Sequence, residues 1–185
     1  MKYKNITISG KIAVGTSTLS HNLQRILGWK YINAGEIQRK FDREHKMNEN
    51  AHGALLRSDN HERSIEAMTQ KMLQTESNII YEAWLAGFVA CDMTDILRVL
   101  LICSNDAIRV DRIVNRDKVT VEEAKLYLKQ REEENTIKWK KLYGDYDFWD
   151  SKYYHLVIDT YSKGQMETVG AVLDKLGYKG KLFNE

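Results

Sequence analysis

The fold of this chain is decided by the stretch Ile6-Thr7-Ile8-Ser9-Gly10-Lys11-Ile12-Ala13-Val14-Gly15-Thr16-Ser17-Thr18. Its β-branched start predicts a short strand that ends at Gly10, and a helical pattern opens near Ser17. Gly10 and Gly15 have the spacing of the G-x-x-x-x-G-K-[ST] loop, whose backbone N–H groups bind phosphate oxygens at a helix N-terminus. Ser17 takes the position of the Mg²⁺-ligating hydroxyl, whereas Thr16 replaces the lysine. An ordinary strand–turn–helix unit is the alternative interpretation.

Size and charge restrict the class of protein. At 185 residues and 21.6 kDa the chain predicts one domain with a substantial core. A net charge of +2, with abundant charges of both signs, argues against nucleic-acid binding. Cys91 and Cys103 lie in apolar surroundings and are interpreted as buried thiols of a reducing compartment. With no signal peptide and no apolar run of about 18 residues, we expect a cytoplasmic monomer that binds no membrane.

Strand and helix patterns alternate along the chain. Strands are predicted at 3–9, 29–33, 78–82, 97–103 and 154–159. Helices are predicted at 17–27, after Ala34-Gly35, at about 62–75, at 106–116, at about 120–143 and at 165–176, while residues 46–60 are left unassigned. This alternation predicts a central parallel sheet covered by helices, which is a three-layer α/β fold.

Five motifs in this order resemble the cytidylate kinase family, and most closely its archaeal-type branch, over about residues 6–176. Residues 10–18 resemble a loop of the form ISGxPGSGTTT, which already lacks the lysine. The other four motifs are Ala34-Gly35-Glu36-Ile37-Gln38-Arg39 (AGxIFR), Arg109-Val110-Asp111-Arg112-Ile113-Val114-Asn115-Arg116 (RAERIxxR), Gln130-Arg131-Glu132 with Lys138-Trp139 and Tyr143 (ERE…RY…Y), and His155-Leu156-Val157-Ile158-Asp159-Thr160 (DLVIDT). The resemblance implies a P-loop NTPase fold with an acceptor-binding helical region at about 35–76 and a helical lid at about 117–143.

The same resemblance implies ATP-dependent phosphorylation of a nucleoside monophosphate, with CMP or dCMP as acceptor and Mg²⁺ as cofactor. ATP would be bound by Gly10, Lys11, Ile12, Ala13, Val14, Gly15, Thr16, Ser17, Thr18, Arg112 and Arg116. The acceptor would be bound by Ala34, Gly35, Arg39, Glu82 and Trp84. Ser17 would ligate the metal directly and Glu82 through water. Positive charge for the transferred phosphoryl group would come from Lys11, Arg112, Arg131 and Lys138.

Three departures from the family pattern leave alternatives open. Ala13 and Val14 replace small residues, which predicts a stiffer or wider loop. Lys11 adds a cation that we expect to replace the missing lysine in part, with a solvated lysine as the alternative. Trp84 stands where the family has an acceptor-binding arginine; it can stack on a base but cannot neutralise a phosphate. Two other functions therefore stay open: a P-loop kinase for another small phosphoryl acceptor, and a nucleotide-binding regulator with weakened catalysis.

Helical spacing predicts which basic side chains share a face of a helix. Arg112 and Arg116 share one helix face with Arg109 nearby, and a purely structural face would tend to avoid the repulsion among three like charges. An anion-binding face and an ordinary exposed basic helix both stay open. Arg131 and Lys138 are seven residues apart and lie on one side of the long helix.

Burial decides how the acidic and aromatic candidates are interpreted. Glu82 closes a buried strand, where a carboxylate needs either a metal ion or a structural ion pair. Trp29, Trp139 and Trp149 are interpreted as packing residues.

Overall fold

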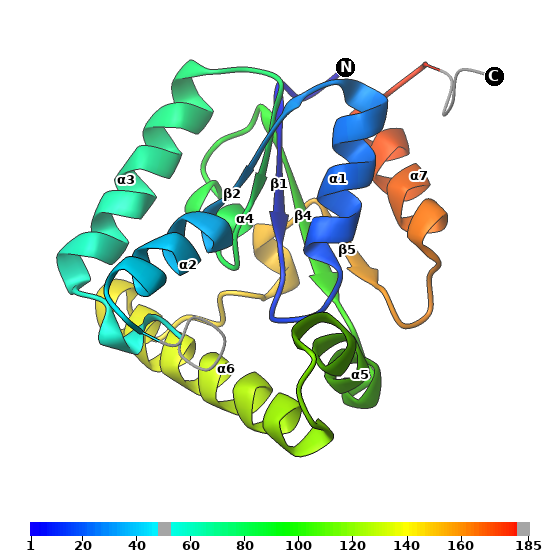
Figure 1. Cartoon of the computed structure of the whole chain (residues 1–185). Helices are drawn as coiled ribbons and strands as arrows, with labels where there is room; N and C mark the ends of the chain where they lie inside the picture. The colour runs from blue at the N-terminus through cyan, green and yellow to red at the C-terminus, as the bar shows by residue number, and fades with distance from the viewer. Residues whose placement is uncertain (48–52, 181–185) are drawn as a thin grey trace.

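The computed structural model describes residues 1–47 and 53–180. Its centre is a five-stranded sheet in the order β2-β3-β1-β4-β5, in which every pairing is parallel (Figure 1). In chain order the elements are β1 (Asn5–Ser9), α1 (Thr16–Leu27), β2 (Lys30–Asn33), α2 (Ala34–Glu44), the 3₁₀ turn η1 (Ala54–Leu56), α3 (Asp59–Thr75), β3 (Ile79–Glu82), α4 (Ala86–Val89), β4 (Ile96–Ile102), α5 (Asp106–Asp117), α6 (Val121–Tyr143), the 3₁₀ turn η2 (Ser151–Tyr153), β5 (Leu156–Asp159) and α7 (Gln165–Leu176).

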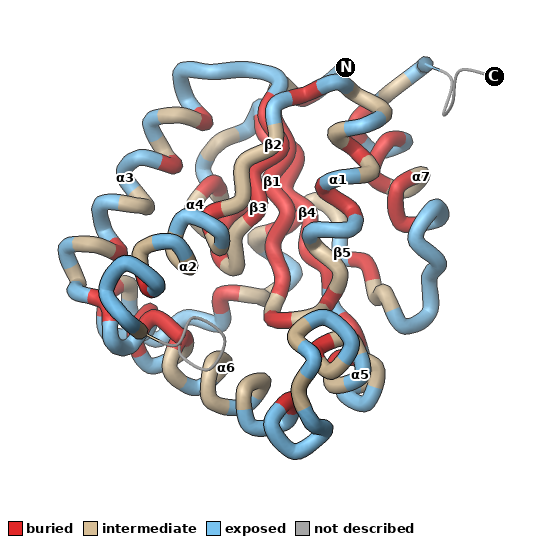
Figure 2. Tube along the Cα trace, viewed as in Figure 1, coloured by how far each residue is buried: buried red, intermediate tan, exposed pale blue. Residues whose placement is uncertain are grey.

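Two cores hold the layers on the sheet. On one face α1 and α7 pack against β1, β4 and β5, and on the other face α3 and α4 pack against β3 and β4. Every residue of β1 is buried, as is all of β4 except its last residue, because a parallel strand inside the sheet is covered on both faces (Figure 2). Helices α5 and α6 lie across the carboxyl ends of the strands (Figure 1). That edge is where open α/β sheets bind their ligands.

The three-layer α/β prediction is confirmed, and local signals placed many of the helix ends correctly. Gly28 ends α1 in the left-handed conformation with φ 66°. Thr120 and Glu123 form the predicted capping box at the start of α6. The helix predicted at 165–176 is α7. Among the helices that the structure describes, none is long and apolar enough to cross a membrane.

Some elements differ from the predictions. Helix α3 begins at Asp59 rather than about Glu62, because the Ser58 side chain caps it by accepting a hydrogen bond from the His61 amide. The sequence interpretation missed α4 and both 3₁₀ turns, which are too short for a periodic signal. Of the unassigned segment 46–60, residues 48–52 lie outside the described residues. The division into an acceptor region at 35–76, which holds α2 and α3, and a lid at 117–143, which holds α6, stays a prediction.

Candidate active site

The glycine-bearing loop joins β1 to α1 at the carboxyl edge of the sheet, as predicted. Gly15 has φ 97° and stands just before the first residue of α1, a conformation that favours glycine. A Cβ at Gly10 would lie 2.5 Å from Val14 Cγ2 and 2.9 Å from the Leu101 carbonyl oxygen, so only glycine fits there. Ala13 also has a positive φ, of 61°. The loop is therefore held in a defined conformation by its own backbone.

Apolar side chains anchor this loop on two sides. Ile12 is buried against Ile113 of α5 and Ala124 of α6. Val14 is buried in the core between the sheet and α1, so its side chain serves packing rather than a cavity. Where the family pattern has small residues at positions 13 and 14, this chain therefore has a loop that is anchored to the surrounding helices by packing.

Arginines of α5 hold the loop by its carbonyl oxygens. Arg109 Nε donates to the Ile12 carbonyl at 3.0 Å, and Arg112 Nη1 donates to the Ala13 carbonyl at 2.9 Å. Arg109 is buried and also pairs with Glu132 of α6. Carboxylates therefore pair with Arg109 and Arg116, whereas among the described residues Arg112 is bonded only to carbonyl and hydroxyl oxygens and keeps its charge uncompensated. The anion-binding role of this helix face stays a prediction.

A buried carboxylate at the end of β3 accepts hydrogen bonds from three hydroxyl groups. Glu82 Oε1 accepts hydrogen bonds from Thr16 Oγ1 at 2.7 Å and from Ser17 Oγ at 2.8 Å. Its Oε2 accepts a short hydrogen bond from the Tyr31 hydroxyl, which itself accepts one from Asn33 Nδ2 at 3.0 Å. In the described part of the chain Glu82 has no ion-pair partner, so the structural ion pair considered for it is not found. Neutral hydroxyl donors leave the negative charge of Glu82 uncompensated.

Tyr31 is a site residue that the sequence interpretation missed. Burial, and next the negative charge of Glu82, raise the pKa of Tyr31, so its hydroxyl stays protonated and donates. Only the pairing of β2 with β3, which sets Asn33 opposite Glu82, brings this strand to the loop. The available signal was weak: two polar side chains, Tyr31 and Asn33, alternate at the end of a short strand.

Most of the predicted site residues line one cavity above the loop, here called the loop cavity. It brings together Gly10, Lys11, Ile12, Ala13, Thr16, Ser17, Gly35, Arg39, Glu82, Trp84, Arg116 and Arg131. Its cationic side chains are those of Lys11, Arg39, Arg43, Arg116 and Arg131, and its carboxylates those of Glu36, Glu82 and Asp117. Five cations against three carboxylates make this cavity suited to a polyanion.

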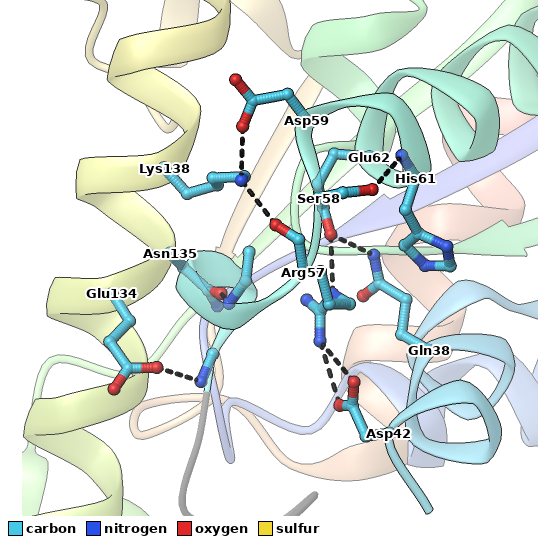
Figure 3. A network of polar contacts seen from close by, with 12 residues as sticks. Gln38, Asp42, Arg57, Ser58, Asp59, His61, Glu62, Glu134, Asn135 and Lys138 are labelled. Carbon is cyan, nitrogen blue, oxygen red and sulfur yellow. Dashed lines mark hydrogen bonds and ion pairs between the residues drawn. The ribbon is translucent and has the colours of Figure 1, made fainter. Parts of the chain in front are cut away.

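A second, inner cavity continues from the first, because Gly35, Arg39, Ala83, Trp84 and Arg131 line both. It also takes in Ala34, together with a network of buried charges shown in Figure 3.

Arg57 lies at the centre of that network, with Nη1 3.0 Å from Asp42 Oδ2 and Nε 2.7 Å from Glu62 Oε1. Trp139 Nε1 donates to the other Glu62 oxygen at 3.3 Å. The wall of the inner cavity thus offers both donors and acceptors beside aromatic rings.

A third cavity, the outer groove, lies on the far side of the loop. It is lined by Gly15 and Thr18 of the loop region and by Arg112 and Arg116 of α5. Arg112 also donates to the Thr160 hydroxyl at 3.2 Å, so its guanidinium is fixed before any ligand binds. The ATP-binding roles assigned to these four residues stay predictions.

The structure places Lys138 away from all three cavities, which argues against the catalytic role expected of it. Lys138 is buried, and its Nζ donates to the Arg57 carbonyl at 2.6 Å and to Asp59 Oδ1 at 2.5 Å (Figure 3). It therefore ties α6 to the start of α3. Lys11 does lie at the loop cavity, but its Nζ is 3.5 Å from Glu132 Oε2 and 4.8 Å from the centroid of the Trp149 ring. Its side chain is still 40% exposed, and its part in phosphoryl transfer stays a prediction.

Trp84 and Arg131 meet where the loop cavity and the inner cavity join. The Arg131 Cζ atom is 6.0 Å from the centroid of the Trp84 ring. Trp84 is in ring contact with Trp139 at 5.7 Å and Trp149 at 6.3 Å, and Trp139 is buried, in keeping with the packing role predicted for these two tryptophans. Trp29, predicted to pack as well, is buried in the core beside α1.

Comparison with known proteins agrees with this geometry. The model of the cytidylate kinase-like family matches residues 5–162. The chain is 37% identical over 169 residues to a cytidylate kinase of Methanosphaerula palustris, with 87% of this chain and 92% of that protein covered. It is 33% identical over 166 residues to a cytidylate kinase of Methanosarcina mazei, with 89% and 91% covered. Among solved structures, a shikimate kinase from Acinetobacter baumannii in complex with shikimate superposes with a TM-score of 0.58 at 14% identity, covering 94% of this chain and 93% of that one.

A glycine-bearing loop between β1 and α1, at the carboxyl edge of a parallel five-stranded sheet, is the arrangement of the P-loop fold. Within that fold class the chain belongs to the cytidylate kinase-like family. As a member of that family it is a nucleotide-binding phosphotransferase.

Proposed function

We propose that this protein transfers a phosphoryl group from ATP to a nucleoside monophosphate, and that CMP or dCMP is the acceptor. The observation that carries the proposal is the loop cavity, in which the glycine loop, the Ser17–Glu82 pair and four arginines line one space. The family match and the two archaeal relatives support the kinase activity.

The donor set beside the loop fits a magnesium ion. Ser17, Thr16 and Glu82 present hydroxyl and carboxylate oxygens within hydrogen-bond distance of one another, and Mg²⁺ prefers oxygen ligands. When bound, the ion would neutralise charge on the phosphates of ATP. Ser17 would ligate it, and Glu82 would orient its water ligands. Tyr31 holds the Glu82 carboxylate in place from the opposite side.

The acceptor would lie across the two joined cavities. Arg39, whose Nη2 is 2.5 Å from Glu36 Oε1, lines both and would bind the acceptor phosphate. The inner cavity would hold the base beside Trp84 and Tyr81, where Arg57 and the carboxylates of Asp42 and Glu62 offer a donor and acceptors. No strong general base is needed, because the attacking phosphate oxygen of the acceptor is already anionic.

A steady-state screen with ATP and Mg²⁺ against CMP, dCMP, UMP, AMP and GMP tests the proposal. We expect the highest kcat/KM with CMP or dCMP. Preference for a small phosphoryl acceptor that is not a nucleotide would favour the second kinase hypothesis. ATP binding without turnover of any acceptor would favour a regulator, the hypothesis that Ala13, Val14 and Trp84 in place of the arginine support.

A further inference from the structure

Arg131 has a donor with no partner in a place that excludes water. Its Nε is shielded from solvent, and no described residue accepts a hydrogen bond from it. Buried donors in folded proteins are nearly always paired, so an unpaired guanidinium donor indicates a missing acceptor. Because Arg131 lines both the loop cavity and the inner cavity, that acceptor would lie where the two cavities join.

The charges around Arg131 also favour an anion at this point. Burial first, and then the positive charges of Arg116 and Arg39, lower the pKa of Arg131 to about 10. The negative charge of Asp117 acts in the opposite direction on this pKa, but both Asp117 oxygens are already bonded to Arg116 at 2.6 and 2.7 Å. A bound anion would relieve the repulsion among the three arginines.

The Trp84 ring lies beside this guanidinium. The Cζ atom of Arg131 lies 6.0 Å from the centroid of the Trp84 ring, within the range of a cation–π contact. The indole is itself held by ring contacts with Trp139 and Trp149, and Trp149 Nε1 donates to the Trp84 carbonyl at 3.3 Å. A guanidinium over an aromatic face keeps its N–H groups free to bind an anion in its own plane.

We propose that Trp84 is a positioning residue that holds Arg131 at the junction of the two cavities, so that Arg131 and Arg39 together bind the phosphate of the acceptor. This inference rests on the proposed function and assigns to position 84 a task other than stacking on the base. Position 84 has no positive charge of its own in this chain. In its place, Arg131 of α6 supplies the positive charge, and its contact with Trp84 sets its position.

The experiment measures, by calorimetry, the binding of CMP and of cytidine to the protein without ATP, so that it does not depend on turnover. Trp84→Leu removes the aromatic face and keeps an apolar side chain, whereas Trp84→Phe keeps an aromatic face. We expect Trp84→Leu to weaken CMP binding about tenfold and cytidine binding less than about twofold, with Trp84→Phe within about threefold of the parent. Trp29→Phe, in the core beside α1, is the matched control for loss of an indole.

A mutant cycle separates positioning from other roles. In an Arg131→Gln background, Trp84→Leu should have no further effect on CMP binding, because the two residues act through one contact. An effect of Trp84→Leu that persists there, or that is equal for CMP and cytidine, overturns the proposal and indicates stacking on the base. Unfolding midpoints check that each variant folds, and Trp84→Met replaces Trp84→Leu if the latter does not.

A failure of the proposed function gives a different pattern. If the parent binds neither CMP nor cytidine, inorganic phosphate is titrated in their place. Loss of phosphate binding in both Trp84→Leu and Arg131→Gln then supports the anion site while the kinase assignment fails. Equal phosphate binding by the parent and both variants overturns the inference.

Discussion

Replacing Arg57 by methionine tests how much the buried charge network contributes to stability. The side chains of Arg57, Asp42 and Glu62 are each only 4 or 5% exposed, and Arg57 is the cation between the two carboxylates. Removing one partner of a buried ion pair costs about 3–5 kcal/mol, because it leaves charge buried without compensation. For a chain of this length that loss corresponds to a fall in Tm of roughly 6–20 °C.

Urea unfolding of parent and variant, followed by circular dichroism, measures the change in the free energy of unfolding. The control is Lys40→Met, which breaks an exposed pair with Glu44 at 4.0 Å and should cost less than about 1 kcal/mol. Adding Asp42→Asn and Glu62→Gln to Arg57→Met should recover part of the loss, since the uncompensated charges are then gone. A loss below about 1 kcal/mol for Arg57→Met, or no recovery in the triple variant, would refute the reasoning.

Four further outcomes are expected. Arg39→Ala should raise KM for the monophosphate roughly 10- to 100-fold, from the ~1.5–3 kcal/mol of a charge-assisted hydrogen bond, and leave KM for ATP unchanged; an equal rise in both would count against the assignment. Ser17→Ala should raise the Mg²⁺ concentration needed for half-maximal activity, whereas the same titration curve as the parent would remove Ser17 from the metal site. Lys11→Met should lower kcat with little change in KM for ATP, and a kcat within about twofold of the parent, under ~0.5 kcal/mol, would show that Lys11 only fastens the loop to α6. Lys138→Met should lower the urea midpoint and keep kcat within about twofold of the parent. Hydrogen bonds from Lys138 and Lys141 lower the pKa of Asp59 from 3.8 to about 2. The ionised Asp59 therefore stabilises the folded protein above pH 3.8, and this contribution is lost as the pH falls towards 2. The pH-dependent contribution should be smaller in Lys138→Met.

Features set by neighbouring residues were accessible from the sequence. Gly10 and Gly15 specify the loop because a side chain at either position clashes or strains the backbone. Gly28 ends α1, and Thr120 with Glu123 starts α6, because each signal is satisfied within a single helical turn. Alternating strand and helix patterns were enough for the three-layer α/β architecture, since a parallel sheet needs a crossover between successive strands.

What each charged side chain does was decided by tertiary structure. Arg109 was expected beside a basic helix face and Lys138 on the same side of the long helix as Arg131, yet both are buried and bonded to oxygens from distant parts of the chain. Tyr31 reaches Glu82 only because β2 pairs with β3, across 51 residues of sequence. Helical spacing predicts which residues share a face of a helix, but it does not predict which face is buried in the folded protein.

By itself, then, the sequence determined the glycine-bearing loop, the alternation of the five strands with the longer helices, and the family, all of which depend on contacts within a few residues or on motifs in a fixed order. Only the tertiary structure decided which cations face the loop cavity, which of them are structural, and that Trp84 meets Arg131. The physical reason is that a charged side chain acts according to its solvation and its partner, and both are set when α5 and α6 close over the carboxyl edge of the sheet (Figure 1).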